Sequence, residues 1–133
     1  MKRRKFIVQT ATPFLAFCAA CSKPETTVPV TGIDFTIDVS NSLPSPGSSV
    51  VRDGVIVVRV DAPDLLSSFI ALQVECTHAA NPVVWNHSAR QFNCNLHGSV
   101  FSINGSVVNG PASRPLKAFN MRLNGTLLRV TGS

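Results

Sequence analysis

The apolar residues of the chain occur in short runs separated by Gly, Pro and Asn, without the period of an amphipathic helix. Residues 33–39 alternate apolar with acidic or polar side chains, which is typical of a strand with one buried face. Residues 55–60 and 69–75 are short, mainly apolar runs, which are typical of buried strands. No segment carries a sustained helical period, so the pattern predicts an all-β domain.

Shorter strands and hairpins are predicted in the second half of the chain. Residues 83–85 and 90–92 flank a polar turn at residues 86–89, which predicts one hairpin. Asn104–Gly105 and Asn124–Gly125 each lie between apolar runs, and Asn-Gly supplies the positive φ angles at both central positions of a type I′ turn. The remaining connections are a predicted loop at residues 41–49 and a predicted turn at residues 61–66.

The positive charge of the chain is concentrated at its N-terminus. The 133 residues include 12 Lys and Arg against 7 Asp and Glu, a net charge of +5. Residues 2–5 carry four of the positive charges, and beyond residue 20 the balance falls to +1. No basic stripe with interleaved aromatic residues remains. Because such a stripe is the electrostatic footprint of a nucleic-acid-binding protein, nucleic acid is excluded as a partner.

Residues 1–20 have the layout of an export signal, with a basic start, a mainly apolar stretch and small residues before Cys21. The apolar stretch is shorter than the roughly 20 residues of a membrane-spanning helix. The pair Arg3–Arg4 followed by apolar residues resembles a twin-arginine signal. The run "CAAC" resembles a lipoprotein cleavage site with Cys21 as the lipidated residue. An ordinary secretory signal with a plain cleavage site is the alternative.

Residues 21–32 are polar and rich in Pro and Thr, which predicts a tether, and residues 33–133 are predicted to form the folded domain. Together these features predict an exported protein on the periplasmic face of a bacterial membrane, held there by lipid on Cys21. Ser22 follows Cys21 instead of the aspartate that retains lipoproteins at the inner membrane, which favours the outer membrane.

Two pairs of metal-binding side chains follow the predicted strand at residues 69–75. Cys76 and His78 are two residues apart, so at an extended strand end both side chains point to one side. Cys94 and His97 can converge in a tight turn, and Gly98 permits sharp bending. The hairpin predicted between the pairs brings them side by side. Two thiols and two imidazoles fit either a structural zinc ion or a two-iron cluster with the thiolates on one iron and the imidazoles on the other.

Cys-x-His, fifteen residues and then Cys-x-x-His-Gly resembles the Rieske iron–sulfur motif. The stretches "HGSVF" and "NGPASRPL" (residues 109–116) resemble the family's segment after the second His and the loop that covers its cluster. The resemblance spans about residues 33–131 and implies an antiparallel β-sandwich with a small cluster-binding hairpin subdomain. It implies a Rieske-type [2Fe-2S] cluster with Cys76 and Cys94 on one iron, His78 and His97 on the other, and further contacts from Ser99, Phe101, Gly110 and Pro111.

The chain departs from the resemblance at two kinds of position. Rieske proteins of the respiratory and photosynthetic cytochrome complexes carry one extra, disulfide-bonded cysteine in each ligand loop, but Asn81 and Leu96 occupy those positions here. In this respect the chain resembles the Rieske ferredoxins. Ser99 keeps a hydroxyl that high-potential members place near a bridging sulfide, whereas Phe101 lacks their tyrosine hydroxyl. Because hydrogen bonds to sulfur stabilise the reduced cluster, we expect an intermediate reduction potential.

The resemblance implies a one-electron carrier with a protein redox donor and acceptor. The sequence contains no recognisable pair of nucleophile and general base, so the chain is not expected to be an enzyme by itself. Two alternatives remain, namely the small electron-transfer subunit of a periplasmic oxidoreductase resembling arsenite oxidase, and a zinc-stabilised binding lipoprotein. Among the other residues, His87 is interpreted as a surface histidine, Trp85 as a packing residue, and Arg90 and Arg114 as surface charges or contacts for an acidic partner.

Overall fold

The computed structural model describes residues 32–132 of the chain. Residues 1–31 and 133 are outside this range, and with them lie the predicted export signal, the predicted lipidation site Cys21 and nearly all of the predicted tether. Among the described residues, no helix is both long enough and apolar enough to cross a bilayer.

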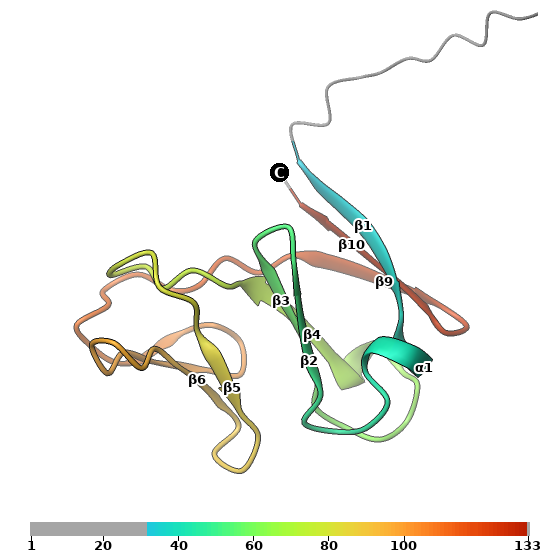
Figure 1. Ribbon diagram of the computed structural model, residues 1–133, viewed down its shortest axis with the longest axis horizontal. Coiled ribbons are helices and arrows are strands. Elements are labelled where there is room, and N and C mark those ends of the chain that lie inside the picture. Colours follow the sequence, from blue (N-terminus) through green and yellow to red (C-terminus); the bar gives the residue numbers. More distant parts are fainter. Residues whose placement is uncertain (1–31, 133) are drawn as a thin grey trace, which may run out of the picture.

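The described residues form ten strands and two short helices, which confirms the all-β prediction (Figure 1). The elements are β1 (Ile33–Asp38), α1 (Val39–Ser42), β2 (Ser49–Arg52), β3 (Val55–Arg59), η2 (Leu66–Ser68), β4 (Phe69–Gln73), β5 (Val84–Asn86), β6 (Gln91–Asn93), β7 (Val100–Ser102), β8 (Val107–Asn109), β9 (Asn120–Asn124) and β10 (Leu127–Gly132).

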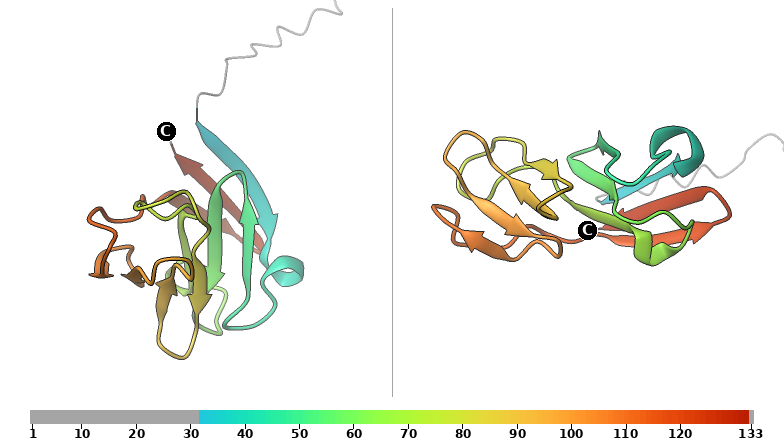
Figure 2. Two further views of the ribbon diagram at one scale, coloured as in Figure 1. Left: turned by 60° about the vertical axis from the view of Figure 1, so that its left-hand side comes forward. Right: turned by 90° about the horizontal axis from the view of Figure 1, so that it is seen from below.

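All strand pairs are antiparallel, and they form three sheets in the orders β1-β10-β9, β2-β3-β4 and β5-β6-β7-β8. The first two sheets make a sandwich, because one buried cluster takes residues from both, including Phe35, Val57 and Leu128. Figure 2 shows the third sheet and its loops on one side of this sandwich. This arrangement is the predicted sandwich with a smaller hairpin subdomain.

Strand β3 joins the two parts because both of its faces are buried. Val55 and Val57 belong to the core of the sandwich, whereas Ile56 and Val58 belong to a second core under the third sheet. Successive side chains of a strand point to opposite faces, so one strand serves both cores. This double burial explains why residues 55–60 are almost continuously apolar rather than alternating.

The sequence pattern missed strand β2 and placed the type I′ turn wrongly. The β2–β3 hairpin turns at Asp53–Gly54, where φ is +51° and +80°, as a type I′ turn requires. Asn104 and Asn124 do not have positive φ, and only the glycines after them do. The reason at residues 103–105 is loop length, because Ser102 N–H donates to the Ser106 carbonyl at 2.8 Å and leaves three loop residues instead of two.

One charged side chain, Arg59, is buried among the described residues. Its guanidinium donates to the Leu43 carbonyl at 2.9 Å, to the Asp61 carbonyl at 3.1 Å and to the Ala62 carbonyl. It also donates to Asp64 Oδ1 at 2.6 Å. The buried charge is therefore matched by four acceptors, and it fixes the loop after β3 to the end of α1.

Candidate metal centre

The first ligand loop, residues 76–81, begins just after β4. Val83 N–H donates to the Val74 carbonyl at 2.7 Å, and Cys76 N–H donates to the Asn81 carbonyl at 2.8 Å. The chain therefore leaves the strand, turns and returns beside itself, which presents Cys76 and His78 at the end of the loop. The extended strand end predicted for this pair is instead a loop closed by its own backbone hydrogen bonds.

The second ligand loop, residues 94–99, is a tight turn, as predicted. Gly98 N–H donates to the Cys94 carbonyl at 3.0 Å, and Cys94 N–H donates to the Ser99 carbonyl at 2.8 Å. Gly98 has φ of +78°, a backbone conformation that favours glycine. The hairpin of β5 and β6 pairs Val84 with Asn93, so the end of the first ligand loop lies beside the start of the second.

The structure brings the four predicted ligands to one end of the small subdomain. Cys76 and Cys94 are buried, at 4% and 1% exposed, whereas both histidines are exposed. The rings of His78 and His97 lie 4.9 Å apart at an angle of 86°. Within residues 32–132 no three His, Cys, Asp or Glu side chains lie close enough together to hold a single metal ion. This donor set, with sulfur inside and nitrogen outside, fits a two-iron cluster with unlike ends.

The backbone around Cys76 favours its thiolate form. Burial raises the pKa of the Cys76 thiol, but donors from the His78 and Ala79 amides and from the Cys94 and Ser99 side chains outweigh burial and hold the pKa below its ordinary value. Because the thiolate is the form that binds metal, these donors prepare Cys76 to act as a ligand.

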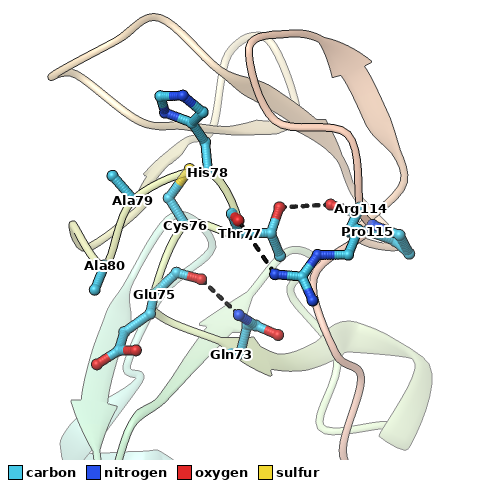
Figure 3. A pocket seen from close by; sticks show the side chains of 9 residues that line it. All are labelled: Gln73, Glu75, Cys76, Thr77, His78, Ala79, Ala80, Arg114 and Pro115. Carbon is cyan, nitrogen blue, oxygen red and sulfur yellow. Dashed lines mark hydrogen bonds between the residues drawn. The ribbon is translucent and has the colours of Figure 1, made fainter.

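A third segment, the covering loop of residues 109–116, contacts both ligand loops. Ala112 N–H donates to Ser99 Oγ at 3.0 Å in a buried contact. Thr77 Oγ1 donates to the Arg114 carbonyl at 2.6 Å (Figure 3). Gly110 and Pro111, for which the resemblance implies cluster contacts, are exposed, and their contacts with the cluster stay a prediction. Neither Thr77 nor Ala112 was predicted, although Thr77 lies between two predicted ligands.

Phe101 and Ser99 are both fully buried, as residues near a cluster would be. Phe101 in β7 faces Phe92 in β6 and belongs to the same core as both cysteines. Trp85 is buried in that core too, with its ring 4.8 Å from the ring of Phe92. Its indole N–H donates to His87 Nδ1 at 3.3 Å, so the exposed His87 has a polar partner that the sequence did not reveal.

The surface around the ligand loops carries almost no charge. No Asp, Glu, Lys or Arg occurs in residues 76–89 or 91–113. Arg90, between these segments, lies 3.8 Å from Asp61 and so faces the sandwich. Arg114 forms no ion pair within residues 32–132. Leu96, beside His97, is 62% exposed.

Comparison with known proteins assigns this arrangement to a family. Residues 35–120 match the family model of the Rieske [2Fe-2S] domain. The cytochrome b6-f complex iron-sulfur subunit of Gloeobacter violaceus is 32% identical over 92 residues, which cover 64% of this chain and 49% of that protein. The chain thus spans half or less of the length of most of the curated relatives it matches.

Two solved structures are similar in fold. A chain of a hyperthermophilic respiratory complex III has a TM-score of 0.57 and 28% identity, covering 70% of this chain and 71% of that chain. The ferredoxin of carbazole 1,9a-dioxygenase from Nocardioides aromaticivorans has a TM-score of 0.53 and 24% identity, covering 71% of this chain and 95% of that one, and this likeness concerns the fold alone. The family match covers well over half of the chain, which confirms the predicted Rieske-type [2Fe-2S] cofactor over the zinc alternative. The chain belongs to the Rieske [2Fe-2S] domain family.

Proposed function

We propose that this protein is a one-electron carrier in which Cys76 and Cys94 hold one iron of the cluster and His78 and His97 hold the other. The observation that carries the proposal is the division of these side chains into two buried thiols and two exposed imidazoles whose rings lie 4.9 Å apart. When bound, the cluster supplies a one-electron couple between its all-ferric and its one-electron-reduced forms.

The residues around the cluster site have separate roles in electron transfer. The exposed imidazoles offer a partner the shortest path to the metal, while burial keeps water from the thiols. Ser99 Oγ accepts a hydrogen bond from Ala112 N–H at 3.0 Å, which fixes the position of the hydroxyl and leaves its own proton free to donate. A fixed donor stabilises the extra negative charge of the reduced state.

The partner in this proposal is a redox protein that meets the uncharged surface beside His97. With no Asp, Glu, Lys or Arg in residues 76–89 or 91–113, long-range electrostatic steering is weak. We therefore expect the rate of electron transfer to depend little on ionic strength. Arg114 and Glu75 are the charged exceptions, since both are exposed and line the pocket beside Cys76 and His78, and the Arg114 guanidinium could meet one acidic group of that partner.

We further propose that the domain works on the periplasmic face of a bacterial membrane, anchored through lipid on Cys21 and with the outer membrane favoured. The support is the sequence of residues 1–21, with its paired arginines, apolar stretch and "CAAC" run. Cell fractionation tests this, because Cys21→Ser should release the protein from the membrane fraction. An unchanged membrane fraction would count against the anchor.

A second candidate is that the chain works as a subunit of a larger redox complex. It is favoured by the relatives themselves, several of which are named iron-sulfur subunits of cytochrome b6-f complexes. Affinity purification from mild detergent separates the two candidates. A stoichiometric catalytic or cytochrome subunit in the eluate would favour the complex, and a single species with the mass of the processed, lipidated chain would favour the free carrier.

The proposed cofactor and ligand set are tested on the purified protein. After expression with working cluster machinery, or after anaerobic reconstitution with ferrous iron and sulfide, we expect visible absorption and an EPR signal that appears on reduction. A preparation that binds no iron under both conditions would reject the electron-carrier proposal.

Phe101→Tyr should raise the reduction potential of the cluster. Phe101 is fully buried in the core that holds both cysteines, and a tyrosine hydroxyl there would add one donor toward sulfur. A gain of about 1 kcal/mol in favour of the reduced state corresponds to a shift of roughly 40 mV for one electron. Voltammetry measures the shift. Phe119→Tyr, in the sandwich, is the control and should leave the potential unchanged.

A further inference from the structure

The dipeptide Asn-Gly occurs three times in the chain, at residues 104–105, 109–110 and 124–125. In such a pair the backbone nitrogen of glycine can attack the carboxamide carbon of asparagine, because glycine has no Cβ to obstruct the approach. A new N–C bond forms, the bond from that carbon to the side-chain nitrogen breaks, and ammonia leaves. Water then opens the resulting cyclic imide at one of its carbonyls and gives aspartate or isoaspartate. The reaction turns a neutral side chain into an anion.

The structure protects the first pair, at residues 104–105, from this reaction. The Gly105 amide donates to the Ser102 carbonyl at 2.9 Å, and Gly105 is buried. The carboxamide oxygen of Asn104 accepts from the Ser106 amide at 3.3 Å and from the Ser102 hydroxyl. Hydrogen bonds therefore hold both the attacking nitrogen and the attacked carboxamide, and ring closure has to break them first.

The second pair, at residues 109–110, is open. Asn109 is the last residue of β8, an edge strand, and both Asn109 and Gly110 are exposed. Within residues 32–132 the Gly110 amide donates no hydrogen bond. The Asn109 carboxamide makes one long hydrogen bond, from Nδ2 to the Gly98 carbonyl at 3.4 Å. In contrast to the first pair, the attacking nitrogen is unrestrained and the carboxamide is held only weakly, so ring closure meets much less resistance.

This open pair lies beside the second ligand loop. Gly98, which accepts from the Asn109 side chain, directly follows His97. No Asp, Glu, Lys or Arg occurs in residues 91–113, so an anion at residue 109 would be the only charged side chain of that segment. The third pair, at residues 124–125, is also exposed, but it lies in the β9–β10 turn on the other side of the molecule (Figure 1). A charge there is remote from the ligand loops and supplies a control.

We propose that the pair Asn109–Gly110 is a site of spontaneous deamidation, which places a negative charge beside the loop of Cys94 and His97. The inference rests on the proposed function in one respect, namely that this loop holds the cluster. A fixed anion near the cluster disfavours the reduced form, since reduction adds a further negative charge. The modification therefore lowers the reduction potential. Because residue 109 is exposed, salt weakens the effect.

Incubation of the purified protein at mildly alkaline pH, followed by peptide mapping with mass spectrometry, tests the chemical step. We expect residue 109 to convert several-fold faster than Asn104, which is the matched internal control. Gly110→Ala should slow this conversion strongly, because a side chain hinders the attack. Alanine fits there, since Gly110 does not have positive φ and an added Cβ would lie no closer than 3.8 Å to atoms beyond its chain neighbours. Conversion at residue 109 that is no faster than at Asn104, or that Gly110→Ala leaves unchanged, would overturn the proposal.

Voltammetry of holoprotein variants tests the electrostatic consequence. Asn109→Asp should shift the reduction potential to a lower value, with a larger shift at low ionic strength, whereas Asn109→Gln should match the parent protein. Asn124→Asp, which places the same charge in the β9–β10 turn, should leave the potential unchanged. A potential that Asn109→Asp does not change, or that Asn124→Asp lowers equally, would overturn this consequence. A parent protein that binds no iron would instead reject the proposed function, while conversion of residue 109 in the metal-free protein would still decide the chemical step.

Discussion

Replacing Cys76 with serine should abolish the cluster while leaving the fold intact. Cys76 is 4% exposed, and the amide donors around it hold the pKa of its thiol below the ordinary value, which favours the thiolate that iron requires. A serine hydroxyl is a hard, protonated oxygen that does not replace this thiolate. Iron and sulfide analysis should fall to the background of the assay, the visible absorption should vanish, and far-ultraviolet circular dichroism should still show β-structure.

The histidines supply a matched comparison for this prediction. His97→Gln should lose the cluster in the same way, whereas His87→Gln should keep it, because His87 bonds to Trp85 in the turn between β5 and β6. Intact colour in Cys76→Ser would refute the ligand assignment. Loss of colour in His87→Gln would mean that the cluster depends on the hairpin turn as well as on the ligand loops.

Replacing Arg59 with methionine should lower the free energy of unfolding by about 3 kcal/mol. The arginine is 6% exposed and supplies hydrogen bonds to three carbonyl groups and to Asp64. Methionine fills much of the volume but leaves those acceptors without a donor. For a domain of about 100 residues, the loss corresponds to a fall in Tm of roughly 15 °C. Denaturant and thermal unfolding of the same preparation measure both quantities.

Arg52→Met is the control that separates the effect of stacking on a phenylalanine ring from the effect of buried hydrogen bonds. Arg52 and Arg59 each lie 5.4 Å from the centre of a phenylalanine ring, Phe35 and Phe69 respectively. Arg52 is exposed, with an ion pair to Asp53 at 3.9 Å and one hydrogen bond to the Thr36 carbonyl at 3.3 Å. Its loss should cost less than about 1 kcal/mol. Equal destabilisation by both substitutions would show that stacking on the ring, rather than the buried acceptors, explains the effect of Arg59.

The strands that were predicted correctly are those whose own pattern of apolar and polar residues reflects which of their faces are buried. The run of residues 55–60 is apolar because β3 has two buried faces, and β1 alternates because it has one. Strand β2 was missed because three of its four residues are exposed, so its extended conformation depends on pairing with β3. The same reason explains the turn at Asp53–Gly54, which is recognisable only once both strands are known.

The candidate site likewise has a part that could be predicted from the sequence and a part that could not. Its four ligand residues form two short motifs in a 22-residue stretch, and the hairpin between them was visible in the pattern, so their approach could be predicted. The Thr77–Arg114 contact spans 37 residues and uses a backbone carbonyl, which any residue type supplies. No periodicity marks such a contact. The cluster contacts of Gly110 and Pro111 rest on the resemblance alone and stay a prediction, whereas the structure shows contacts of Ala112 and Arg114 with the ligand loops.

Strand β3 also limits how this protein can be divided for engineering. A transplanted electron-transfer module cut between the sandwich and the third sheet would lose Ile56 and Val58 from its own interior. A module that retained the strand would expose Val55 and Val57 to solvent as an apolar surface that promotes aggregation. A portable version of this redox unit should therefore carry β3 with threonine or lysine at those two positions, so that the severed surface becomes a soluble exterior.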